Sequence, residues 1–591
     1  MGLRSYILLI VCLVAPLTGW GQTLPSATLE VKMDETTATL SFATDWCDPT
    51  PCDGGWYEIA VEGMCGDCGV VGAPALPTIS HLVRLPAGST VYLEEWRGTE
   101  GIATLPVGER LRPVREGWFK DMPQPALVAD EELYGTKRYY RAGEPVEVEN
   151  LGCMGDEQIF RITLHPFAVD HGEGRIYYYR RMEVTLSFHR TPLPQASDAM
   201  GRLLIVTRHK FEEGLREFVR WKRQEGYDVT TLYATTHQRD SVRALIRTVA
   251  RPDYLLLVGD AGELQSFVAS APSLELGSHI TDLPYADYTG DGLPDVCYGR
   301  WTVNNAAELS VVVQKTLRYE QFCDMDTALL RRTLLVAGQE GTQPAPITTN
   351  GQVNYLKDEL RVSHPEIDTL CYYNPTSGNQ LPAIVDAIGH GAGLLNYTAH
   401  CTVGGWTHPA LSIGSIDTLE ETQPMVYVNN CCKSNDFGGT CFGEQLLRQE
   451  GGGGVAVIGA TNSTLWEEDY WWAVGPKPVL ALTPTYDADR RGAFDCLAGR
   501  FPTVATCGEM LREGGVAVMA SGSNYINFYW QIYCLLGDPT LRPYIGIPDS
   551  IALEVATPES GATTLMLRGT PGAWVTALQD TVFLGRCMVE N

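Results

Sequence analysis

From about residue 203 onward the chain alternates short apolar runs with amphipathic stretches, and this alternation constrains its fold more than any other feature. The stretch 212–225 has helical periodicity, with Leu215, Phe218 and Trp221 on one face. Alternating strands and helices are typical of a mostly parallel sheet with helices on both faces. Strands are expected at 203–207, 227–233, 254–260, 333–337, 367–373, 393–398, 425–430 and 454–459.

Two of these apolar runs end in reactive side chains. The run 393–399 leads into His400, and the run 425–431 leads into Cys432. Ligands collect beyond the carboxyl ends of parallel strands, so these two side chains are candidates for one site. An imidazole and a thiol brought together there can form an imidazole–thiolate pair, the minimum equipment for nucleophilic acyl transfer.

The flanks of this α/β region have a different pattern. Residues 22–198 alternate apolar and polar side chains with turns between, which predicts a β-rich unit resembling a sandwich. Residues 546–591 return to short alternating strands, too few for a complete immunoglobulin-like sandwich. We therefore expect a signal peptide at 1–21, a β-rich unit at 22–198, an α/β unit at 199–545 and an immunoglobulin-like β segment at 546–591.

The N-terminal residues indicate an exported protein. Arg4 followed by an apolar stretch and the small residues Gly19 and Gly21 predicts a secretory signal, cleaved before Gln22, and a secreted or cell-surface location. No later segment has the ~18 apolar residues of a membrane span. The net charge of −27 argues against nucleic acid and anionic membranes as partners.

Seventeen cysteines in an exported chain favour some disulfides. Cys47, Cys52, Cys65 and Cys68 form two close pairs, for which disulfides are expected in preference to a zinc site.

One loop is rich in carboxylates around two glycines. Asp287 and Asp291 could ligate a structural calcium ion, because calcium prefers clustered oxygens. The alternative is a tight turn in which the same side chains cap backbone amides.

A resemblance becomes specific at three motifs: 397–400, 430–432 and 441–444. Together they resemble the gingipain family of cysteine peptidases, which implies a caspase-like fold for residues 200–545. The segment 460–475 and the doubled Cys431-Cys432 look closest to the lysine-specific gingipain.

This resemblance implies a set of catalytic residues. Cys432 would be the nucleophile and His400 the general acid and base, with Asp295, just before Gly299-Arg300, orienting the imidazole. Backbone N–H groups of Cys401 and Cys432 would form the oxyanion hole. Cys401 could also pair with Cys432 or its neighbour and silence the site. No cofactor is required for this chemistry.

The resemblance also implies a preference for basic residues. Asp469 would bind the substrate ammonium, with Trp466 as an apolar wall, although the same residues could simply begin a helix. Arginine-specific members place an acid nearer Glu308, so cleavage after Arg is the runner-up.

The expected function is therefore a secreted endopeptidase made as a zymogen, which cleaves proteins or peptides after Lys. Residues 22–198 would be a propeptide that blocks the cleft, removed at Arg190 or Arg202 by an activating protease. Two alternatives remain at this point: a sortase-like transpeptidase, and an inactive surface binding protein on the same scaffold.

Overall fold

The structure is a computed structural model of the chain. It describes residues 26–590 except 47, 67–68, 136–138, 193–199, 272–275, 323–324, 341–347, 417–418, 420–422, 480–482, 485, 489, 501–504, 558–560, 562 and 580–581. The expected signal peptide and two of the four paired cysteines, Cys47 and Cys68, lie outside the described residues, so both expectations stay predictions.

The N-terminal unit is built mainly of β-strands, as its alternating pattern predicts. One sheet has the order β1-β2-β11-β10-β7 with β6 on β11, and a second has the order β5-β9-β8. Alternate side chains such as Leu40, Ile162 and Val184 form its core. The strands are β1 (Ala27–Met33), β2 (Thr37–Thr44), β5 (Ile79–Pro86), β6 (Thr90–Thr104), β7 (Tyr139–Tyr140), β8 (Val146–Met154), β9 (Glu157–Leu164), β10 (Phe167–Asp170) and β11 (Arg175–His189).

The second unit contains a ten-stranded sheet of order β13-β12-β14-β17-β25-β24-β23-β20-β18-β19. Its strands pair in parallel except for β24 and β25, which confirms the predicted fold class. Their bounds are β12 (Arg202–Thr207), β13 (Asp228–Tyr233), β14 (Tyr254–Val258), β17 (Cys297–Trp301), β18 (Arg332–Ala337), β19 (Asp368–Tyr372), β20 (Leu394–Thr398), β23 (Met425–Asn430), β24 (Gly454–Ala460) and β25 (Tyr533–Gly537).

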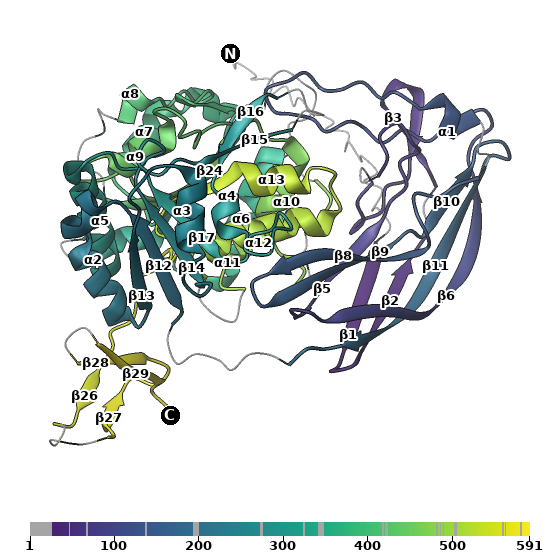
Figure 1. Cartoon of the computed structure of the whole chain (residues 1–591). Helices are drawn as coiled ribbons and strands as arrows, with labels where there is room; N and C mark the ends of the chain where they lie inside the picture. Colours follow the sequence, from purple (N-terminus) through teal and green to yellow (C-terminus); the bar gives the residue numbers. More distant parts are fainter. Residues whose placement is uncertain are drawn as a thin grey trace, which may run out of the picture.

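Helices cover both faces of this sheet (Figure 1). One face packs against α2 (Glu212–Glu225), α5 (Ala306–Gln321), α7 (Leu381–Gly389) and α9 (Phe442–Arg448). The other packs against α3 (Arg239–Ile246), α6 (Thr348–Ser363), α10 (Trp466–Val474), α11 (Ala493–Leu497), α12 (Cys507–Ser521) and α13 (Ile526–Ile532). No helix in the described part of the chain is both long and apolar enough to cross a membrane.

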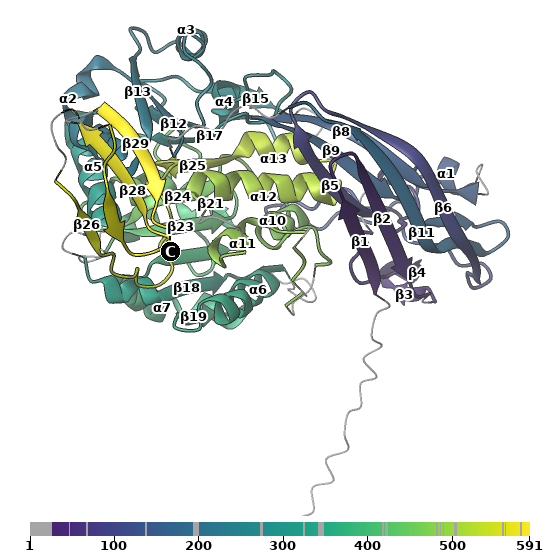
Figure 2. The same ribbon diagram turned by 90° about the horizontal axis from the view of Figure 1, so that it is seen from below.

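The C-terminal segment forms two two-stranded sheets, and Figure 2 shows it on the opposite side of the α/β unit from the N-terminal unit. The strands are β26 (Leu553–Val555), β27 (Leu567–Gly569), β28 (Trp574–Gln579) and β29 (Val582–Met588). Strand β28 contacts α2, where the Thr576 hydroxyl donates to the Glu225 carbonyl at 3.4 Å.

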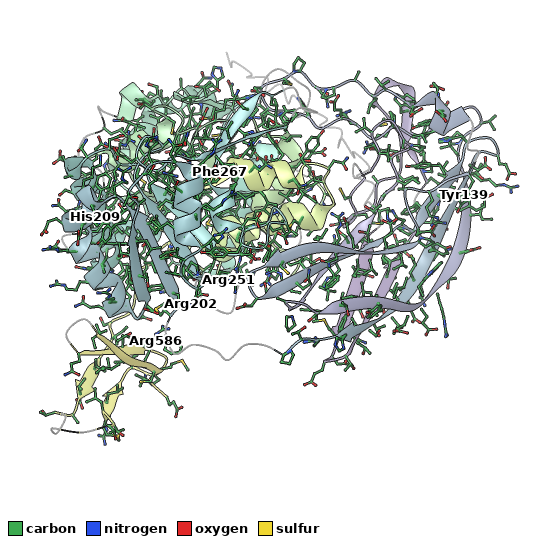
Figure 3. The ribbon with its side chains drawn as sticks, viewed as in Figure 1. Tyr139, Arg202, His209, Arg251, Phe267 and Arg586 are labelled. Atoms are coloured by element: carbon green, nitrogen blue, oxygen red, sulfur yellow. The ribbon has the colours of Figure 1, made fainter. Side chains whose placement is uncertain are left out.

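The N-terminal unit contacts the α/β unit through the tip of the β8–β9 hairpin. The Cys153 N–H donates to Asp291 Oδ2 at 2.7 Å, and Arg251 pairs with Asp156 at 2.5 Å. Figure 3 places Arg251 at the boundary between the two units. A second contact is made by residues 117–121, which are called the inserted segment below. The Lys120 side chain donates to the Asn430 carbonyl, and the Gly117 N–H donates to the Tyr525 hydroxyl.

Candidate active site

His400 and Cys432 lie at the ends of neighbouring strands. The register of β20 and β23 ends with the pair Thr398 and Asn430, and both reactive residues stand two positions beyond that pair. Parallel pairing therefore brings the imidazole and the thiol to the same edge of the sheet, as the two apolar runs predict.

The imidazole of His400 is oriented by a backbone carbonyl. Its Nε2 lies 3.3 Å from the carbonyl oxygen of Glu340, and its ring meets the Trp466 ring edge to face at 5.1 Å. A carbonyl can only accept, so Nε2 carries the proton and Nδ1 is the basic nitrogen. Burial lowers the pKa of His400, so the neutral ring is favoured here.

The Cys432 thiol is buried and accepts a hydrogen bond. Its side chain is 1% exposed, and the Thr464 N–H donates to Sγ at 3.3 Å. Burial raises the pKa of Cys432 to about 12. The next residue, Lys433, has φ 56°, a left-handed conformation that side chains other than glycine rarely adopt. Such strain is typical of functional turns.

The neighbouring cysteines do not bridge the site. Cys401, Cys431 and Cys432 are all free thiols, and both neighbours are buried in the core. Cys401 Sγ donates to the Thr402 carbonyl at 3.3 Å. The thiol of Cys432 is therefore not consumed by either of the pairings that the sequence allowed.

The inserted segment pairs with the backbone beside Cys432. The Lys120 N–H donates to the Thr464 carbonyl at 2.9 Å, and the Trp466 N–H donates to the Trp118 carbonyl at 3.1 Å. Between these bonds, Phe119 and Leu465 form an antiparallel bridge. The inserted segment thus pairs with residues 464–466 through an isolated antiparallel bridge, the backbone pairing that extended peptides use.

The side chain of Lys120 fills a closed pocket. Its Nζ lies 2.6 Å from Asp469 Oδ2, and both side chains are fully buried. Nζ also donates to the Asn430 carbonyl at 2.9 Å and lies 4.9 Å from the centre of the Trp466 ring. Asp469 and Trp466 therefore both contact Lys120 and also lie in the first turn of α10. Their role in binding a substrate ammonium stays a prediction.

The other oxygen of Asp469 is held by two tyrosines. The hydroxyls of Tyr529 and Tyr533 donate to Oδ1 at 2.9 and 2.6 Å. These bonds fix the carboxylate and leave Oδ2 for the ammonium, which is what a buried charge requires.

Asp295 does not lie beside His400. It precedes β17, and in the sheet order β25, β24 and β23 stand between β17 and β20, a width of at least about 19 Å. Its Oδ2 accepts from the N–H groups of Tyr288 and Thr289 at 2.6 and 2.8 Å, and its Oδ1 accepts from Gly155 at 3.1 Å. Asp295 caps a loop, and the group on the imidazole is the Glu340 carbonyl, which the sequence argument missed.

The first comparison with known proteins concerns families. Residues 196–544, more than half of the chain, match the model of peptidase family C25. The chain belongs to peptidase family C25.

The chain is also similar to individual members. Lys-gingipain of Porphyromonas gingivalis is 26% identical over 584 residues, covering 88% of this chain and 33% of the relative. The chain therefore spans about a third of the length of this relative.

Among solved structures, one described as a protease has a TM-score of 0.59 at 24% identity and covers 67% of this chain and 90% of its own. The crystal structure of the Arg-specific cysteine proteinase gingipain R has a TM-score of 0.57 at 19% identity, with coverage of 67% and 91%. These likenesses show the fold of the C25 unit.

The Asp287 loop of this C25 peptidase has the contacts of a capped turn. Asp287 accepts from the N–H groups of Gly290 and Gly292, and Asp291 accepts from Leu293 and Cys153. Among the described residues, no group of three or more His, Cys, Asp or Glu side chains is placed to hold a metal ion. The calcium site stays a prediction.

The candidate processing residues differ in accessibility. Arg190 follows β11 and is exposed, whereas Arg202 is the first residue of β12, where its N–H and its guanidinium both bind Asp253. A protease needs extended, unpaired backbone, and of the two residues Arg190 is the more accessible. Processing at either residue stays a prediction. Glu308 pairs with Arg448 at 3.5 Å and accepts from the Asn304 N–H at the start of α5, so it does not reach the Lys120 pocket.

Alkylation of Cys432 in the intact C25 chain should rise with pH and reach no plateau. Because its pKa is about 12, the reactive thiolate increases roughly tenfold for each pH unit between 7 and 10. Mass spectrometry of the Cys432 peptide after iodoacetamide pulses measures this profile. A plateau near neutral pH in the intact chain would contradict the buried thiol.

Proposed function

We propose that the chain is the zymogen of an exported cysteine endopeptidase that cleaves after lysine. The observation that carries this proposal is the buried ion pair of Lys120 with Asp469, at 2.6 Å, on a segment that pairs like a substrate beside Cys432. A pocket that closes on one lysine ammonium and offers it a carboxylate is the chemistry of lysine recognition.

In the proposed mechanism, Cys432 attacks the carbonyl carbon of the residue after which the chain is cut. His400 Nδ1 takes the thiol proton and then gives it to the leaving amine, which produces a thioester. Water, deprotonated by the same nitrogen, attacks the thioester and releases the acid and the thiol. Backbone N–H groups of Cys401 and Cys432 stabilise the oxyanion in both steps.

The Glu340 carbonyl performs the orienting role in this mechanism. By accepting from Nε2 it fixes the tautomer and stabilises the imidazolium that forms when Nδ1 takes the proton. No acidic side chain is needed for this contact.

Residues 22–198 are then a propeptide. Its inserted segment covers the nucleophile and fills the lysine pocket, so proteins and peptides cannot enter while it is seated. Because no lysine lies between Arg190 and Arg202, a lysine-specific enzyme needs another protease for this cut.

The test uses the full chain nicked in the 190–202 segment by limited proteolysis, with reductant present. Paired fluorogenic peptides that differ only in Lys or Arg at the cleavage position should be cut with a ratio of about 100 in favour of Lys. We expect this ratio because the longer arginine side chain does not fit in the space that Lys120 fills, where its ammonium contacts Asp469 and the Asn430 carbonyl.

A lysine chloromethyl ketone provides the second measurement. It should label Cys432, and the label should disappear in Cys432→Ala. Cys401→Ala is the matched control and should keep the label. Failure of the reduced, nicked chain to hydrolyse any Lys peptide or to take the label would overturn the proposal.

A further inference from the structure

The inserted segment also occupies a site beside the lysine pocket. Side chains of an extended strand alternate in direction. Trp118 and Lys120 both contact Trp466, the first at 6.1 Å between ring centres and the second at 4.9 Å. Phe119, between them, points to the other side.

The ring of Phe119 lies between two aromatic side chains of the α/β unit. Its centre is 6.0 Å from that of Tyr525 and 6.2 Å from that of Phe528, with planes at 81° and 80°. Both contacts are edge-to-face, the arrangement that aromatic pairs prefer. Phe119 is only 6% exposed, so this site encloses nearly all of the side chain.

Tyr525 also positions the backbone of the same segment. Its hydroxyl accepts from the Gly117 N–H at 2.9 Å, while its ring faces Phe119. Tyr525, at the start of α13, therefore contacts both the Gly117 N–H and the Phe119 ring of the extended segment.

We propose that Tyr525 and Phe528 form the subsite for the residue that precedes the cleaved lysine, and that this subsite selects an aromatic side chain. The inference rests on the proposed function, because it takes the inserted segment as a template of the substrate. The substrate class is then an exposed polypeptide stretch with Phe or Tyr immediately before Lys.

The aromatic preference is expected because the Tyr525 and Phe528 rings lose their apolar cover when the propeptide leaves. Tyr525 and Phe528 belong to the α/β unit, so departure of Phe119 exposes their rings to water. A substrate aromatic ring covers them again and regains apolar burial and two edge-to-face contacts. A small or acidic residue in this position regains neither.

Internal competition tests this preference. Two peptides that differ only in Phe or Ser before Lys are mixed, and the nicked full chain cuts them in one tube. The ratio of their kcat/KM values does not depend on the active fraction or on residual bound propeptide, because both substrates compete for the same free enzyme. We expect a ratio of about ten, the size of two aromatic contacts.

Variants assign the preference to the subsite. Tyr525→Ala should lower the ratio to about one third of its value, whereas Tyr525→Phe, which keeps the ring, should retain it. Tyr233→Ala is the matched control, since Tyr233 stacks on His209 at the other end of the sheet.

The outcomes are separable. If both Lys peptides are cut but the wild-type ratio is near one, or Tyr525→Ala leaves it unchanged, the subsite is wrong and the proposed function stands. If neither peptide is cut by the reduced chain, the proposed function itself fails.

Discussion

Replacing Lys120 by methionine should make the uncut full chain hydrolyse Lys peptides at least about 100-fold faster than the uncut wild-type chain. Methionine keeps most of the length of the side chain but leaves Asp469 buried without its cation. Removing one partner of a buried ion pair costs about 3–5 kcal/mol, which shifts the balance from the seated to the unseated segment by a factor of ~10² to ~5 × 10³. Initial rates on a fluorogenic Lys peptide, with gel analysis to show that the chain is intact, measure the effect.

A matched substitution distinguishes the effect of emptying the Lys120 pocket from the effect of weakening any contact between the N-terminal unit and the α/β unit. Arg84→Met removes another ion pair between the same two units, Arg84 with Glu513 at 2.8 Å, but it lies outside the cleft and is partly exposed. It should raise the activity only a few-fold. If Lys120→Met is as latent as the wild type, yet becomes active after nicking, Lys120 does not control the cleft.

Asp469→Asn should lower kcat/KM for Lys peptides by about 10³ in the nicked enzyme. The amide keeps the shape and can still bind the Tyr529 and Tyr533 hydroxyls, but the substrate ammonium enters the pocket without a counter-charge. A peptide with Met in the Lys position carries no charge and should change by less than about three-fold. The ratio of the two rates is the measurement.

The same substitution should have the opposite effect on the uncut chain. Lys120 loses its partner too, so the inserted segment unseats and Cys432 becomes accessible to alkylation. Misfolding would not produce both effects, slower cleavage of Lys peptides with unchanged cleavage of the Met peptide in the nicked enzyme, and faster Cys432 alkylation in the uncut chain. Glu467→Gln, two residues earlier on α10, is the control for charge alone. Unchanged Lys cleavage in Asp469→Asn would remove Asp469 from the pocket's function.

The strands that carry the site could be predicted because they are buried on both faces. Such strands are short, apolar and bounded by turn residues, so β20 and β23 and the residues after them stand out in the sequence. Strand β25 does not stand out, because Tyr533 follows α13 directly and both elements are largely apolar. Periodicity cannot separate a short buried strand from a buried helix end.

The group that orients His400 could not be identified from the Gly299-Arg300 motif. The resemblance points to Asp295 by its place before Gly299-Arg300, but that motif fixes its position just before β17 and not its distance from β20. Glu340 was detectable by topology: it follows β18, the strand adjacent to β20, at the carboxyl end. Its contact is through a backbone carbonyl, which no residue type signals.

The lysine in the pocket could not be predicted from the sequence. Lys120 and Asp469 are far apart in the chain, and the segment around Lys120 has no periodic pattern. Only the three-dimensional arrangement shows that Lys120 is buried against Asp469.

The separation between the 190–202 linker and the inserted segment has a kinetic consequence. Arg202 begins β12, and Lys120 lies beyond β23, five strand spacings or about 24 Å away in the sheet order. Severing the linker therefore breaks one covalent bond and leaves Lys120 seated. Turnover begins when the severed piece dissociates, so the onset of catalysis should show a lag set by the dissociation rate, and the final rate per enzyme molecule should rise on dilution.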